Sequence, residues 1–128
     1  MWLFTKHGFY SVVTARGPTG APVPEHMMVR ARRRDHLQNL LDKFPEEFSG
    51  RFIVETTESD YRFRLFLLKE DWIDVAAQLA AEITYNNFKD QIADQPEYAE
   101  LAGDVWLTMY GLQEPRQRYE APESNFRD

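Results

Sequence analysis

The chain has 128 residues, no cysteine and a formal net charge of −6. This length suits one domain with its own core, and the lack of cysteine excludes disulfides, thiolate metal ligands and a thiol nucleophile. Residues 1–69 carry a net charge of +3 and residues 70–128 a net charge of −9. The negative total argues against loose, non-specific binding to nucleic acid.

The start of the sequence lacks the basic segment and the long apolar run of a signal peptide. The most apolar helical stretch, residues 75–81, is far shorter than the ~20 residues that cross a bilayer. We therefore expect a cytoplasmic protein with no membrane partner.

Aromatic and β-branched residues predict strands near the start of the chain. Residues 2–4 form a short β-type run that ends before Gly8, and residues 9–16 and 26–32 form two longer strands. Residues 17–25 hold three prolines and two glycines, which predicts an exposed loop.

A helix follows over residues 35–44, with Asp35 as its expected N-cap and Pro45 as its stop. Residues 51–56 form a third strand, and residues 60–68 form a fourth with clean alternation. On this fourth strand, one side is expected to carry Tyr61, Phe63, Leu65 and Leu67, and the other Arg62 and Arg64.

The second half of the sequence is predicted to be helical. The helix over residues 70–83 should bury a stripe formed by Trp72, Val75, Ala76, Leu79 and Ile83. A break at residues 84–87 separates it from later helical segments, the last of which spans residues 97–112 with Leu101, Val105, Met109 and Leu112 as its stripe. Residues 113–128 are polar and aperiodic, so we expect a disordered tail after a single domain of residues 1–112.

This order predicts an α+β fold with an antiparallel four-stranded sheet. Residues 26–83 supply most of a ferredoxin-like split βαβ plait. The strand at residues 9–16 can take the missing place, which gives a permuted plait with the sheet order 9–16, 26–32, 60–68, 51–56. Two helices would cover one face, and the C-terminal helices would be additions.

In this arrangement Arg30, Arg32, Arg62 and Arg64 all point away from the two covering helices. Like charges that face each other across a sheet repel, so four guanidinium groups on adjacent strands need an anionic counterpart. Three alternatives could supply this counterpart. In the first, the last helix folds back over the face, and its acidic residues Glu97, Glu100 or Asp104 pair with the arginines.

In the second alternative, a protein partner or a second copy covers the face, because Met28, Phe66 and Leu68 beside arginine resemble interface composition. In the third, the face binds phosphate, carboxylate or single-stranded nucleic acid, with Tyr10 and Phe66 available to stack on bases. Nucleic acid is not favoured, since arginines stand where RNA-binding plaits carry their aromatic residues.

Other candidates are weaker. Two asparagines between aromatic residues, with Asn87 as the main candidate, suit a ligand site or a helix cap, and the cap is favoured. The histidines show no metal-ligand spacing, and His36 on a first helical turn is expected at the surface. We therefore predict no metal, no cofactor and no catalytic residue.

Four stretches resemble a family of small, uncharacterised bacterial proteins: residues 2–13, residues 60–64, residues 83–89 and residues 105–110. The resemblance covers about residues 1–112. It implies a bacterial cytosolic domain that stands alone, and it transfers no catalytic or binding residue.

The sequence thus favours a non-enzymatic interaction or binding module that uses an arginine-bearing sheet face, with homodimerisation as one form of it. The alternative is a binder of a small anionic ligand or single-stranded nucleic acid. An enzyme requires the arginines, Tyr10 and His7 to line one closed pocket.

Overall fold

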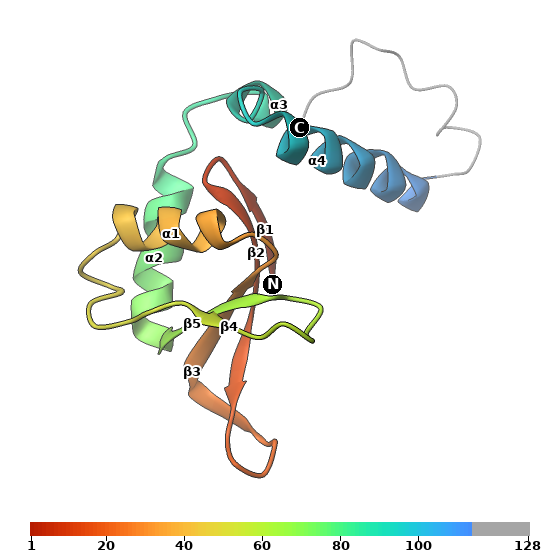
Figure 1. Cartoon of the computed structure of the whole chain (residues 1–128). Coiled ribbons are helices and arrows are strands. Elements are labelled where there is room, and N and C mark those ends of the chain that lie inside the picture. Colours follow the sequence, from red (N-terminus) through yellow and green to blue (C-terminus); the bar gives the residue numbers. More distant parts are fainter. Residues whose placement is uncertain (114–128) are drawn as a thin grey trace. The chain divides into compact units, whose positions relative to one another are not determined.

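The computed structural model describes residues 1–113, which belong to two compact units that divide after Ile83 (Figure 1). Each unit is described by itself. The single domain expected over residues 1–112 therefore spans both units. Most of the tail expected over residues 113–128 lies outside the described residues.

The first unit is built on an antiparallel sheet of five strands in the order β1-β2-β3-β5-β4. The strands are β1 (Trp2–Thr5), β2 (Gly8–Arg16), β3 (Pro22–Ala31), β4 (Val54–Glu55) and β5 (Phe63–Leu68). The expected α+β class is confirmed, and so is the order of the four predicted strands. The expected count of four was wrong, because residues 2–5 pair with β2 and add an edge strand.

The bounds of three strands differ from the prediction: β4 covers only two of the expected residues 51–56, β5 begins at Phe63 instead of residue 60, and β3 is longer at its start. β3 begins at Pro22, inside the expected loop, and its first residues pair only with β2 past a register shift at Thr14/Ala15. Pairing with β5 begins at His26. The missing proline N–H groups therefore face an unpaired edge, which a sheet tolerates.

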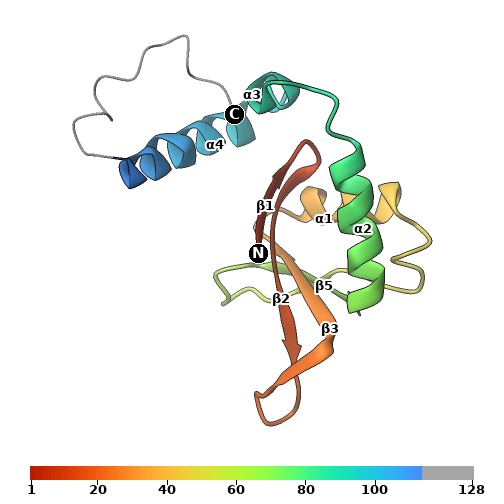
Figure 2. The same ribbon diagram turned by 180° about the vertical axis from the view of Figure 1, so that it is seen from behind.

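Both helices of this unit, α1 (Arg34–Lys43) and α2 (Lys69–Ala81), lie on the same side of the sheet (Figures 1 and 2). Their apolar stripes bury Leu37, Leu40, Trp72, Val75 and Leu79 against Tyr10, Val12, Val29, Leu65 and Leu67 of the sheet. Ile83 is 60% exposed because α2 ends before it. Asp35 lies inside the first turn of α1 rather than at its N-cap, which is Arg33.

The second unit contains α3 (Phe88–Gln91), α4 (Pro96–Met109) and the short 3₁₀ helix η1 (Tyr110–Leu112). The helix break expected at residues 84–87 is confirmed. Ile92 and Tyr98 are buried, whereas most of the stripe expected for the last helix is exposed: Leu101, Met109 and Leu112.

Candidate anion-binding face

The sheet face that points away from α1 and α2 carries paired arginines. We call it the arginine face; its residues are Trp2, Phe4, Phe9, Ser11, Met28, Arg30, Arg64 and Phe66. Their place follows from the registers between strands, in which Trp2 pairs with Ser11, Ser11 with Arg30, and Arg30 with Arg64. The prediction that β3 and β5 are central neighbours is therefore confirmed, and the register places Arg30 directly opposite Arg64.

Arg30 and Arg64 are held by neutral groups. Arg30 donates to the Ser11 hydroxyl at 2.7 Å, and its guanidinium carbon lies 4.6 Å from the centre of the Tyr61 ring. Arg64 donates to the Met28 sulfur at 3.2 Å and to the Ser59 hydroxyl. Within the first unit, residues 1–83, neither arginine forms an ion pair with a carboxylate.

Both guanidinium groups are also incompletely hydrogen-bonded. The Nε atoms of Arg30 and Arg64 are buried and have no hydrogen-bond partner in the part of the chain that the structure describes. A buried donor without a partner costs about 1–3 kcal/mol, and directly opposed like charges on a sheet add to this cost. The arrangement is therefore unfavourable unless an anion lies close enough to neutralise the two guanidinium groups.

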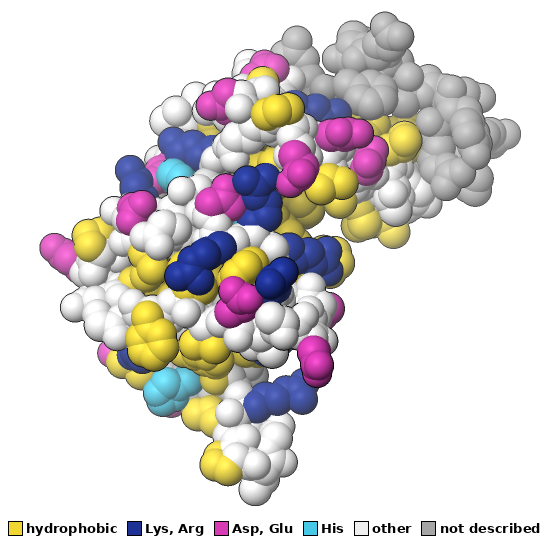
Figure 3. Space-filling model, in the orientation of Figure 1, with side chains coloured by type: hydrophobic (Ala, Val, Ile, Leu, Met, Phe, Trp, Pro, Cys, Tyr) yellow, Lys and Arg dark blue, Asp and Glu magenta, His cyan; other side chains and the backbone are white. Residues whose placement is uncertain are grey.

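The other two predicted arginines are placed differently. Arg62 forms an ion pair with Glu55 of β4 at 3.1 Å, so its charge already has an acidic partner. Arg32 donates to the carbonyl oxygen of Asp60 at 3.3 Å, and its guanidinium carbon lies 4.5 Å from the centre of the Tyr61 ring. Figure 3 shows Lys and Arg side chains gathered near the start of α1, where residues 32–34 are exposed.

Tyr61 lies on the other side of the sheet from the one predicted. Its ring contacts Arg30 and Arg32 and lies 6.5 Å from the ring of Phe9, and its side chain is buried. The reason is that β5 begins at Phe63. Residues before it form a turn, where the alternation of a strand does not hold.

A hollow of about 840 Å³ lies over one end of the arginine face. Arg16, which was not among the predicted site residues, joins Arg30 and Arg64 in the wall of this hollow. Its position at the end of a predicted strand, beside a predicted loop, was the only available signal. The lining residues are Val13, Thr14, Arg16, Gly20, Pro22, Met28, Arg30, Arg64 and Phe66.

Tyr10 does not belong to this face, contrary to the prediction. It is fully buried on the helix-covered side, and its hydroxyl donates to the carbonyl oxygen of His36 at 2.6 Å. In the register of β2 and β3, Ser11 and not Tyr10 lies opposite Arg30. Tyr10 therefore cannot stack on a ligand at the arginines.

Replacing Tyr10 by phenylalanine should lower the free energy of unfolding by about 1 kcal/mol, since one buried hydrogen bond is lost while the ring is kept. Chemical denaturation measures this change. Binding of any anionic ligand should stay the same. Weaker binding in a folded Tyr10→Phe variant would contradict the placement of Tyr10 in the core.

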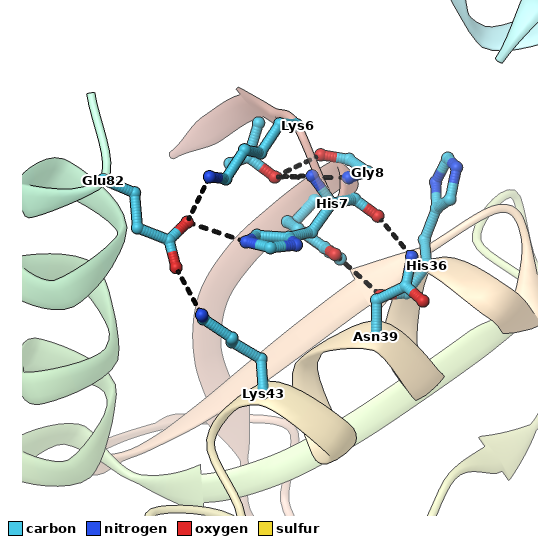
Figure 4. Close-up of polar contacts among 9 residues, drawn as sticks. Lys6, His7, Gly8, His36, Asn39, Lys43 and Glu82 are labelled. Atoms are coloured by element: carbon cyan, nitrogen blue, oxygen red, sulfur yellow. Dashed lines mark hydrogen bonds and ion pairs between the residues drawn. The ribbon is translucent and has the colours of Figure 1, made fainter. Parts of the chain in front are cut away.

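A second polar cluster gathers around Glu82 at the end of α2 (Figure 4). The Glu82 carboxylate accepts from His7 Nε2 at 2.7 Å and lies 3.9 Å from Lys6 Nζ and 3.5 Å from Lys43 Nζ. Burial raises the pKa of Glu82, but the hydrogen bond from His7 and the charges of His7, Lys6 and Lys43 outweigh it and lower the pKa below its ordinary value. The cluster joins the β1–β2 turn to both helices.

His36 is buried, contrary to the surface position predicted for it. Its Nδ1 accepts a hydrogen bond from the backbone N–H of Phe9 at 3.3 Å, and its ring packs against Gly8. The nearby turn is fixed further by Asn39, which donates to the carbonyl oxygen of His7 at 2.8 Å (Figure 4). This explains why a histidine on the first turn of α1 faces the sheet.

Asn87 caps α3, as the favoured alternative predicted: its side-chain oxygen accepts from the backbone N–H of Asp90 at 3.4 Å. The expected pairing of Glu97, Glu100 or Asp104 with the arginines concerns two separate units and stays a prediction. The expected binding role of Asn87 is likewise untested.

Among residues 1–113, no group of three or more His, Asp or Glu side chains is placed to hold a metal ion. None of the helices described is long and apolar enough to cross a membrane. Comparison with protein-family models, curated proteins and solved structures found no match to this chain, so the resemblance to small bacterial proteins stays a prediction.

Proposed function

We propose that the protein is a non-enzymatic binding module whose arginine face takes up an anionic group, carboxylate or phosphate, at Arg30 and Arg64. One observation carries this proposal: two arginines lie directly opposite each other with no carboxylate partner within their own unit, residues 1–83. We further propose that β2, β3, β5 and β4 with the two helices form a permuted ferredoxin-like plait, and that the protein is cytoplasmic.

The chemistry of the arginines supports an anion. A guanidinium group presents a planar set of donors that matches carboxylate or phosphate oxygens in pairs. Arg30 and Arg64 are held in place by Ser11, Tyr61, Met28 and Ser59, none of which neutralises charge. An anion between them would therefore find ordered donors, and little side-chain entropy would be lost on binding.

The hypothesis that the protein is an enzyme has less support. That hypothesis required Tyr10 and His7 to line one pocket with the arginines. Tyr10 lies on the opposite face of the sheet, and neither residue lines the hollow beside Arg30 and Arg64.

A second copy of the chain is the other candidate for this surface, because Trp2 is 66% exposed and Phe66 37% exposed on it. In a two-fold dimer the same patch faces itself. Arginines of one copy would then approach arginines of the other, and like charges across an interface cost several kcal/mol. The geometry therefore favours an acidic partner over a symmetric dimer.

The Arg64→Met variant tests the proposal. Without ligand, it should raise the free energy of unfolding by about 1 kcal/mol, because it removes a buried unpaired charge and the repulsion of Arg30. The same variant should abolish the rise in melting temperature that inorganic polyphosphate or poly-glutamate gives the wild type. Thermal unfolding with and without these polyanions measures both effects.

Arg51→Met is the matched control, since Arg51 is exposed and lies outside the arginine face. It should change neither the free energy of unfolding nor the rise in melting temperature that polyanions give. A polyanion response that survives in the Arg30→Met and Arg64→Met variants would refute the proposal. A marked loss of stability in ligand-free Arg64→Met would also contradict it, since Arg64 would then serve as a structural partner. Light scattering counts subunits in the same samples.

A further inference from the structure

We infer that the anion is the phosphate of a single-stranded nucleic acid, with bases stacked on Trp2 and Phe66; this inference rests on the proposed function. The observation behind it is the order of side chains across the arginine face. One cross-strand row runs Trp2, Ser11, Arg30, Arg64. A neighbouring row runs Val13, Met28, Phe66. The exposed ring of Trp2 thus lies on the β1 side of the two arginines, and the ring of Phe66 lies beside them on β5, two residues from Arg64.

Trp2 offers a fixed stacking surface. Its ring lies edge-on to Phe9 at 5.9 Å, and Phe9 stacks on Phe4 at 4.5 Å. The backbone before Trp2 is tied to β2, since the Met1 carbonyl oxygen accepts from the Val12 N–H at 2.8 Å, and Leu3 after it pairs with Tyr10 of β2. Yet Trp2 is 66% exposed. A large ring that is held in place and left open is what a nucleobase needs for stacking.

Phe66 offers a second surface at the other end. It is 37% exposed and shares the wall of the hollow with Arg16, Arg30 and Arg64. Neighbouring strands lie about 4.8 Å apart, so the three strand steps from β1 to β5 separate Trp2 from Phe66 by about 14 Å or more. Arg30 lies on a strand between them, and Arg64 lies on β5 beside Phe66. This alternation of ring, positive charge and ring matches a strand of bases and phosphates.

An acidic peptide fits less well. Its carboxylates would engage the arginines but would leave Trp2 and Phe66 without a planar partner. A duplex would hide its bases, so the rings could not stack on them. Single-stranded nucleic acid uses both features of the face, and sheet surfaces that combine aromatic and basic side chains bind it without strict sequence preference.

Fluorescence anisotropy tests the inference with four labelled probes: a short single-stranded RNA, the single-stranded DNA of the same sequence, the DNA duplex and poly-glutamate. The full chain should bind the single strands better than the duplex. Trp2→Ala and Phe66→Ala should each weaken single-strand binding by about tenfold. Phe52→Ala is the matched control, because Phe52 is 75% exposed and lies outside the arginine face. Thermal unfolding confirms that each variant is folded.

The outcomes separate the two proposals. If poly-glutamate binds through Arg30 and Arg64 but the single strands do not, the inference is overturned and the proposed function stands. If single strands bind and folded Trp2→Ala binds them equally well, attraction is electrostatic alone and the inference is overturned. If neither poly-glutamate nor any nucleic acid binds, the proposed function and the inference are both overturned. If single strands bind through Trp2 and Phe66, tighter binding of the RNA or of the DNA identifies which nucleic acid the face prefers.

Discussion

Replacing Gly8 by alanine is expected to lower the free energy of unfolding by about 3 kcal/mol. Gly8 has a φ of +151°, which an L side chain rarely adopts. A Cβ there would also lie 2.4 Å from Cγ of His36. His36 is buried and accepts a hydrogen bond from Phe9, so its ring cannot simply swing away. Urea denaturation measures the loss.

Gly20→Ala separates the two causes. Gly20 also has a positive φ, +84°, but nothing lies within 4 Å of a Cβ built there. In this control, the free energy of unfolding should fall by about 1 kcal/mol, because only backbone strain is introduced. Equal losses in the two variants would show that the contact with His36 contributes nothing. If the contact does contribute, removing the imidazole in a His36→Ala background should make Gly8→Ala less costly.

Replacing Glu82 by glutamine is expected to cost about 2 kcal/mol near neutral pH, the order of a hydrogen bond to a charged group. The Glu82 side chain is 17% exposed and lies 2.7 Å from His7 Nε2, with Lys6 and Lys43 also within 4 Å. Glutamine keeps the size of the side chain but leaves three cationic or donor groups without their carboxylate. Glu58→Gln, at an exposed turn position, is the control and should be near neutral.

The pH dependence gives a second measurement of the same cluster. The His7 hydrogen bond and the surrounding positive charges outweigh burial and hold the pKa of Glu82 below its ordinary value of 4.5. A carboxyl group with a lowered pKa stabilises the fold fully above its unfolded pKa, and this stability is lost as pH falls through the folded pKa. Wild type and Glu82→Gln should therefore differ most near neutral pH and converge in acid. A difference that grows on acidification would contradict this assignment.

The regular elements could be predicted because their signals are local. Alternation in residues 63–68 and helical spacing in residues 37–44 and 72–79 place apolar side chains on one face whatever the rest of the chain does. These patterns predicted the elements, and matching their order to a split βαβ plait predicted the strand order β2-β3-β5-β4, which the structure confirms. The prediction also placed Arg30 and Arg64 on one face of neighbouring strands, and the register shows that they lie directly opposite each other.

The failures lie where a local pattern ends or where two segments must be placed relative to each other. Tyr61 precedes β5, so strand alternation did not apply to it. Tyr10 was assigned to the wrong face because its side depends on the register of β2 against β3, and a slip of one residue exchanges the two faces of a strand. The contact of His36 with Gly8 joins the start of α1 to the first turn of the sheet, a distance along the chain that no periodicity spans.

The sequence by itself thus determined the regular elements and the shared face of Arg30 and Arg64, because alternation and helical spacing follow from backbone geometry. The sheet order followed from matching these elements to a known arrangement of strands and helices. Tertiary structure alone decided which arginines lack a carboxylate. Arg62 pairs with Glu55 across a turn, while within the first unit Arg30 and Arg64 hydrogen-bond only to neutral side chains. It also decided that His7 and Glu82, 75 residues apart, form a hydrogen bond. Such partners depend on where separate elements come together in space, which no local pattern in the chain records.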